Sequence, residues 1–274
     1  MRSRIRAIVP CLAVVIVVLQ VLPARGQSFW LDPDRGNSFS LELAKVDLEG
    51  NPDLTFTTAV WNLSGRFQMN NDFWFIFEMP FSHVDFSGDY PADNDFGNPF
   101  VGLRRTLSDS NTAIEFGVRP PIAQEDKVNA NAYGVFSDLD RFGAFVPHIL
   151  TLKVMADILH RFENTMFVRG RAGMSELIQT KDYGGDRTET LIHIGGQVGF
   201  QQEQYRAWAG VNTVTILTED SFFGEDRMEF EVDFGANLRL GTFEPGIFAR
   251  FPAITDLSDY VSSVYGLNCT FKIQ

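Results

Sequence analysis

The stretch Met228-Glu229-Phe230-Glu231-Val232-Asp233-Phe234-Gly235-Ala236-Asn237-Leu238-Arg239-Leu240 alternates between an unbroken apolar set and a set that carries four charges. Alternation with a period of two places the two sets on opposite faces of a β-strand. A run of thirteen residues is long for a soluble sheet, where strands of about five or six residues are usual. It suits a tilted strand that crosses a bilayer, which needs roughly 9–11 residues. The stretch therefore predicts a membrane-spanning strand.

The same alternation recurs along the whole chain. It predicts twelve strands, at 38–47, 54–69, 73–84, 99–107, 112–120, 147–161, 166–177, 189–200, 205–216, 227–240, 243–252 and 260–273. Short polar turns alternate with longer, mostly acidic loops, a pattern typical of bacterial outer-membrane barrels. The predicted fold is all-β: a transmembrane antiparallel up-and-down β-barrel of about 12 strands, with short periplasmic turns and longer extracellular loops.

Aromatic residues are concentrated on the apolar faces of these segments, and the chain contains 26 Phe. So much aromatic bulk suits lipid and the interfacial girdles better than a lumen. The alternative is a soluble periplasmic β-sandwich or barrel, in which the apolar face would point inward. The net charge of −12 argues against a nucleic-acid partner, because phosphate contacts need clustered Lys and Arg.

The N-terminus has the pattern of a Sec-type signal peptide. Three of the first six residues are Arg, an apolar run covers 8–22, and small residues stand at positions 24 and 26. We therefore predict a cleaved signal peptide at 1–26, an N-terminal periplasmic segment at 27–37 and the barrel at 38–274. A membrane anchor is the alternative, but the apolar run is shorter than the ~20 residues of a spanning helix. The predicted location is the Gram-negative outer membrane, and the predicted partners are its lipid, lipopolysaccharide and the barrel-assembly machinery.

Short turns determine which residues of neighbouring strands oppose each other. With Gly241-Thr242 as a two-residue turn, Asp233 opposes Arg250 and Arg239 opposes Glu244. The other short turns oppose further charged pairs: Asp157 with Arg171, and Arg104 with Glu115. Opposite charges facing each other support the predicted register.

The polar faces predict the residues of the lumen. The candidates are Arg66, Glu78, Arg104, Glu115, Arg119, Lys153, Asp157, Arg169, Arg171, Glu229, Glu231, Asp233, Arg239, Glu244 and Arg250. Two interpretations stay open. The charges line an aqueous pore, or they form an ion-paired plug that makes the barrel rigid.

The longest predicted loop, 121–146, has the composition of a folded segment. Tyr133, Phe136, Leu139 and Phe142 recur at three-residue spacing, which predicts an amphipathic helix of two or three turns. Ser137-Asp138 and Asp140-Arg141 would occupy its other side. So short a helix must rest on the barrel mouth, the lumen wall or the outer leaflet. We predict that the four apolar residues form a gate, with a cap that only protects the rim as the alternative.

Four short motifs carry a family resemblance: Glu78-Met79-Pro80-Phe81, Gly97-Asn98-Pro99-Phe100-Val101-Gly102-Leu103, Gly246-Ile247-Phe248-Ala249-Arg250-Phe251-Pro252 and Tyr265-Gly266-Leu267-Asn268-Cys269-Thr270-Phe271. With the alternation, they make the mature chain resemble bacterial outer-membrane β-barrel proteins of the porin or transporter type. More loosely, the chain is similar to the transporter-like barrels associated with phenol-degradation pathways. The resemblance implies a barrel through which a small solute passes.

Catalytic and metal-binding patterns are sparse. Ser82 and His83 are adjacent, so their side chains point to opposite faces. His83 shares a face with Asp85, but that face is the outer one. The run Asp93 to Asn98 is similar to a calcium loop without its bidentate Glu, so we predict a solvated acidic loop. Cys11 leaves with the signal peptide, so Cys269 has no disulfide partner. We expect no catalytic residues, no metal and no cofactor.

Three functions remain as hypotheses. The first is a passive channel or transporter for small polar or amphipathic solutes. The second is a non-conducting structural or adhesion barrel that presents acidic extracellular loops. The third is an outer-membrane hydrolase, and we expect the protein not to be an enzyme.

Overall fold

The computed structural model describes residues 36–50, 54–87, 91–107, 111–163, 165–182, 187–218, 228–253 and 257–273. The predicted signal peptide and residues 27–35 lie outside these ranges. Among the described residues, no helix combines the length and the apolar character needed to cross a bilayer.

Long strands make up most of the structure. They are β1 Asn37–Leu48, β2 Ala59–Gln68, β3 Phe73–Val84, β4 Asp93–Phe96, β5 Phe100–Thr106, β6 Thr112–Arg119, β7 Ile149–Arg161, β8 Met166–Gln179, β9 Thr188–Gln201, β10 Tyr205–Ile216, β11 Met228–Leu238, β12 Phe243–Pro252 and β13 Val261–Ile273. The described helices are α2 Val128–Val135, the 3₁₀ helix η1 Leu139–Phe145 and the short α3 Leu257–Tyr260.

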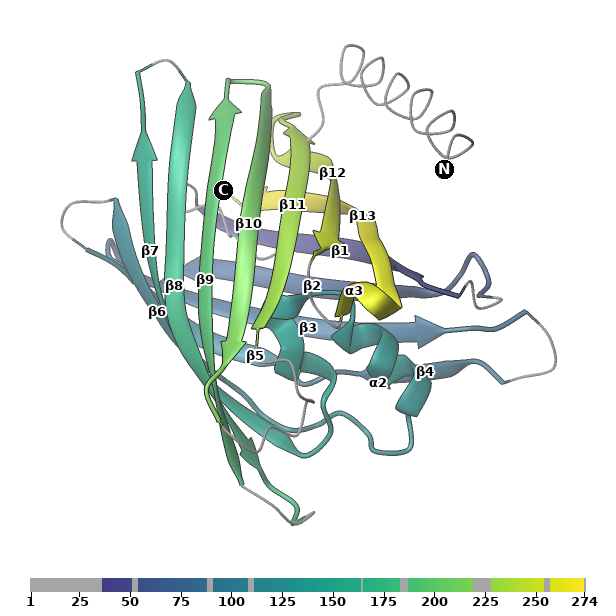
Figure 1. Ribbon diagram of the computed structural model, residues 1–274. Coiled ribbons are helices and arrows are strands. Elements are labelled where there is room, and N and C mark those ends of the chain that lie inside the picture. The colour runs from purple at the N-terminus through teal and green to yellow at the C-terminus, as the bar shows by residue number, and fades with distance from the viewer. Residues whose placement is uncertain are drawn as a thin grey trace.

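The sheet closes on itself. Neighbouring strands pair antiparallel, and β1 pairs with both β2 and β13, which completes the ring. Both β4 and β5 pair with β3, at its two ends, so together they form one interrupted strand of a 12-strand barrel. Figure 1 shows the turns after β7 and β9 at the top, with α2 and α3 toward the other end. The predicted fold class is confirmed.

The strands differ from the prediction by more than two residues in two places. The predicted second strand, 54–69, begins only at Ala59. Residues 55–58 form a turn in which the Thr55 amide and the Thr58 hydroxyl donate to the backbone oxygen of Asp85, at 2.9 Å each. These bonds replace ladder pairing. The structure also adds β4 within a predicted loop.

The predicted register is confirmed. Asp233 opposes Arg250 across β11 and β12. Leu240 and Phe243 form a bridge on either side of the Gly241-Thr242 turn. The other predicted pairs also hold: Asp157 with Arg171, Arg104 with Glu115, and Arg239 with Glu244, whose side chains lie 3.1 Å apart.

The two faces of the wall differ as a membrane barrel requires. The outer face exposes large apolar side chains, including Leu41, Trp61, Phe116, Val154, Phe234 and Leu267. The alternate positions are mostly polar and buried inside the ring. The soluble alternative, in which the apolar face points inward, is therefore wrong.

We predict that Asp157 holds the wall together through its ion pairs. Its carboxylate accepts from Arg104 Nη1 at 2.8 Å and from Arg169 Nε at 2.7 Å, and all three side chains are buried. Asp157→Asn would leave two buried guanidinium groups without their shared anion, so we expect a loss of about 3–5 kcal/mol in unfolding free energy. The measurement is urea unfolding in lipid vesicles.

The matched control is Asp182→Asn, which breaks the exposed pair with Arg187 at 2.9 Å. An exposed pair contributes about 1 kcal/mol at most. Equal losses in the two variants would contradict the structural role of the buried pair.

Candidate functional site

The fifteen candidate lumen residues of the sequence lie on inner-facing positions of the strands. Thirteen are buried, while Glu229 and Arg239 are half-buried. Side chains on the wall of a wide aqueous channel would stay exposed, so their burial shows that the lumen is largely filled. Whether they line a pore in another state stays a prediction.

Most of these charges are brought into ion pairs within the wall. Arg119 pairs with Glu78 at 2.6 Å, and Arg171 pairs with Glu115 at 3.2 Å. Gln197 donates to Asp233 at 3.3 Å. The guanidinium of Arg66 instead lies 4.5 Å from the ring centre of Trp74. Paired charges are the condition for burying them at all.

Residues 120–148, which we call the lumen segment, enter the interior: Ala130, Tyr133, Leu139 and Phe145 are buried, whereas Ile122 and Val128 remain exposed. They contain α2 and η1, so the predicted single amphipathic helix is wrong. The helical path is interrupted at Asp138, whose backbone is extended. The Asp138 carboxylate accepts a hydrogen bond from the Asp140 amide at 3.0 Å and so caps a new helix. A capping side chain of this kind competes with continuation of the preceding helix.

The four predicted gate residues contact two opposite walls of the barrel. Tyr133 and Phe136 pack against an apolar cluster from β1, β2, β3, β12 and β13. Leu139 and Phe142 pack against a second cluster from β7, β8, β9 and β10. Of the three surfaces that the sequence left open, the structure selects the lumen wall. The Tyr133 hydroxyl donates to the Val46 oxygen at 3.1 Å, and burial raises its pKa to about 12.

The polar side of the lumen segment is buried as well, and it faces charges of the wall. Arg141 Nη1 lies 3.2 Å from the Glu42 carboxylate of β1 and 2.9 Å from Asp138. Arg250 of β12 contacts the same two carboxylates, at 3.2 Å each, and donates to the Ser137 oxygen at 2.7 Å. Two guanidinium groups and two carboxylates thus bind the segment to both strands.

Asn98 anchors both ends of the lumen segment. Its Nδ2 donates to the oxygens of Gly143 and Val146, at 2.9 and 2.8 Å. Its Oδ1 accepts from the amides of Ile122 and Ala123, at 2.6 and 2.8 Å. These four bonds use the full capacity of an amide side chain. The alternation of the sequence did not predict this role.

The position of Asn98 explains why its side chain is available. It lies in the three residues that separate β4 from β5, where the pairing with β3 shifts by one residue. Such a bulge turns a side chain away from the strand alternation. A Gly-Asn-Pro sequence within an alternating run was the signal that could have found it.

The predicted solvated acidic loop at 93–98 is wrong. Its first residues form β4, and Asp95 is buried. The Asp95 carboxylate accepts from the Gln124 amide at 2.8 Å, and that of Asp93 accepts from the Ala130 amide at 3.2 Å. These carboxylates therefore bind the backbone of the lumen segment.

A Ser–His–Asp chain of hydrogen bonds connects the lumen segment to β8 and β9. Ser175 Oγ lies 2.9 Å from His193 Nε2, and His193 Nδ1 lies 3.1 Å from Asp140 Oδ1. Burial by itself would raise the pKa of Asp140, but the hydrogen bond with His193 and the charge of Lys153 hold it well below its usual range. The carboxylate is therefore ionised.

This arrangement has the order of groups that activates a serine nucleophile. The cavity beside it has a volume of only about 10 Å³, which is at the lower limit for one water molecule. A substrate carbonyl has no room there. Asp140 belongs to the lumen segment, so withdrawing the segment to make room would also remove the acid. Within the described ranges, no three His, Cys, Asp or Glu side chains are grouped so as to hold a metal ion.

Comparisons with known proteins identify the architecture. No family model and no curated protein matches the chain. Among solved structures it is similar to the NanC porin, with 9% identity and a TM-score of 0.57 over 86% of this chain and 100% of that one. It is also similar to the translocator domain of the autotransporter NalP from Neisseria meningitidis, with 8% identity and a TM-score of 0.56 over 88% and 90%. The chain is an outer-membrane-type β-barrel. The resemblance to the phenol-degradation group stays a prediction.

In this outer-membrane barrel the lumen segment is the connection between β6 and β7, folded inward instead of projecting outward. Its contacts to the wall are hydrogen bonds, ion pairs and apolar packing, whereas the strands carry the ladder bonds that close the ring. The strand pairing that closes the ring therefore does not include the segment.

We predict that Asn98→Ala releases the lumen segment. Loss of four buried hydrogen bonds, each contributing about 1 kcal/mol, should raise the rate of trypsin cleavage after buried Arg141 at least tenfold, because cleavage follows the population of the open form. Asn94→Ala is the control, since the Asn94 side chain bonds to half-buried His83 on β3, at 2.6 Å. Equal cleavage rates in two variants that both keep heat-resistant barrels would exclude the anchoring role.

Proposed function

We propose that this protein is a gated outer-membrane channel for small polar or amphipathic solutes, with the lumen segment as its gate. The observation that carries this proposal is that residues 120–148 pack by non-covalent contacts inside a ring of strands whose pairing is complete without them. The barrel does not need the segment for its ladder pairing. A barrel with a removable interior segment has two states, filled and open.

The charges below the segment support a path for polar solutes. Arg104, Asp157 and Arg169 belong to the strands of the wall and pair with one another there. A barrel whose interior is permanently filled would not require such charged groups. Replacing a buried ion pair with apolar residues often leaves the stability of a protein unchanged or raises it. With the segment withdrawn, these charges would be wet and paired, as on the wall of a polar pore. One of the similar structures named above is a porin, which agrees with this proposal.

A disulfide between the gate and the wall tests whether the gate moves. A Cβ at Gly143 of η1 would lie 3.7 Å from the Cβ of Thr151 on β7, within the range of disulfide geometry. Gly143→Cys with Thr151→Cys, in a Cys269→Ser background, should lock the segment. We expect channel opening in planar bilayers to fall at least tenfold on oxidation and to return on reduction.

Two controls make the result specific. Gly143→Cys alone in the Cys269→Ser background should not respond to oxidation. Deletion of residues 124–143 should raise single-channel conductance and make it insensitive to oxidant. Conductance that is absent in the deletion variant, although the barrel is inserted and heat-stable, would favour the non-conducting structural alternative.

A hydrolase is the second candidate, because of the Ser175–His193–Asp140 chain. An activated serine would react with a fluorophosphonate probe, and the label would disappear in Ser175→Ala. We expect no label on Ser175, because the cavity beside it holds no more than one water. Stoichiometric labelling of Ser175 in the folded barrel would replace the channel proposal with the hydrolase.

A further inference from the structure

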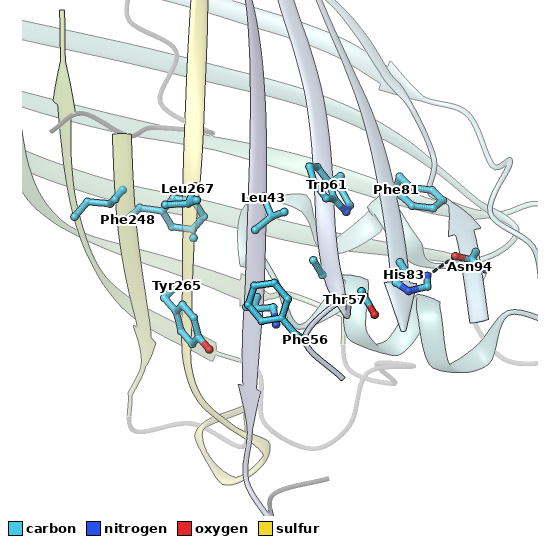
Figure 2. Close-up of a pocket in the computed structure, with 14 residues that line it drawn as sticks. Leu43, Phe56, Thr57, Trp61, Phe81, His83, Asn94, Phe248, Tyr265 and Leu267 are labelled. Atoms are coloured by element: carbon cyan, nitrogen blue, oxygen red, sulfur yellow. Dashed lines mark hydrogen bonds between the residues drawn. The ribbon is translucent and has the colours of Figure 1, made fainter. Parts of the chain in front are cut away.

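The lipid-facing side of the barrel is hollowed over β12, β13, β1, β2 and β3. The groove has a volume of about 830 Å³ and is drawn in Figure 2. Its size falls within the range of small-molecule sites, about 300–1,000 Å³. It lies on the outer face of the wall, so it does not belong to the lumen.

The groove is built from two cross-strand rows of outward-facing residues. The first row is apolar and crosses five strands in register: Ile247, Leu267, Leu43, Trp61 and Phe81. The second row, one pair nearer the long loops, is mostly polar: Tyr265, Lys45, Ala59, His83 and Asn94. Ala59, the smallest side chain of this row, is among the residues that line the groove.

A smaller polar pocket of about 160 Å³ adjoins the loop end of the groove. It shares Lys45 and Tyr265 with the groove and is also lined by Thr55 and Thr58. The ring of Phe56 lies 4.5 Å from Lys45 Nζ. The other charged residue of the pocket is Asp47, whose carboxylate accepts from Ser262 at 2.8 Å.

We propose that the groove and the pocket together form a binding site for a lipid of the outer leaflet whose phosphate headgroup carries a net negative charge. The apolar row would hold an acyl chain on the bilayer side, and the pocket would hold the headgroup at the membrane surface. This polarity, apolar toward the membrane centre and polar toward the loops, matches the orientation of a lipid in that leaflet. The ammonium of Lys45 supplies the charge that selects phosphate.

Trp61 makes the site measurable, because it lies in the apolar row and a brominated acyl chain quenches indole fluorescence on contact. The protein is reconstituted in phosphatidylcholine vesicles that contain a fraction of brominated lipid, either phosphatidic acid or phosphatidylcholine. The Trp61 signal is the difference between the wild type and Trp61→Phe. We expect brominated phosphatidic acid to quench it at a roughly fivefold lower mole fraction, the effect of one basic side chain near a membrane surface.

Two variants control for nonspecific lipid contact. Lys45→Gln keeps the groove but removes the charge, so the preference for phosphatidic acid should fall to about one. Leu152→Trp in the Trp61→Phe background places an indole on the outer face of β7, away from the groove, and should show no preference.

The proposal is overturned if both lipids quench Trp61 equally, or if the preference persists in Lys45→Gln. It is also overturned if a free brominated fatty acid quenches Trp61 more strongly than brominated phosphatidic acid does. That result would assign the groove to a soluble amphiphile instead of a membrane lipid.

Discussion

Closure of the sheet is the constraint on which the rest of this structure depends. Backbone amides and carbonyls have no hydrogen-bonding partner in lipid, so a sheet can cross a bilayer only as a ring. The pairing of β1 with β13 completes that ring. Once the ring is closed, every strand must present apolar residues to lipid and send its other face inward. The charged lumen is therefore a consequence of closure, and its charges must be paired or solvated.

At one depth of the barrel, the lumen segment supplies ion-pair partners for those inward charges. Arg141 brings a cation to Glu42 of β1, while Asp138 brings an anion to Arg250 of β12. Apolar side chains of the same segment bridge the two walls nearer the long loops. The segment is thus held by many weak contacts that do not include the ladder bonds of the ring. Reversible opening, as proposed above, would break only such contacts.

The Ser175–His193–Asp140 chain shows why geometry of a few atoms does not define an activity. The distances suit a catalytic serine, but the acid is supplied by the segment that closes the site. The same bonds serve equally as an attachment of the segment to β8 and β9. The two interpretations differ in the space that they require for a substrate, and the cavity beside Ser175 has a volume of about 10 Å³.

The sequence by itself determined most of the strands, the face of most of their residues and the register of the hairpins, because alternation and turn length are local properties of the chain. Asp233 and Arg250 could be paired from a two-residue turn alone. The tertiary structure alone decided what fills the lumen and where the outer wall is hollow. Asn98 meets Gly143 and Val146 only because the ring brings them together, and Trp61 joins Leu267 in one row only because the first and last strands pair. Contacts between residues so distant in the chain depend on closure, which no local pattern encodes.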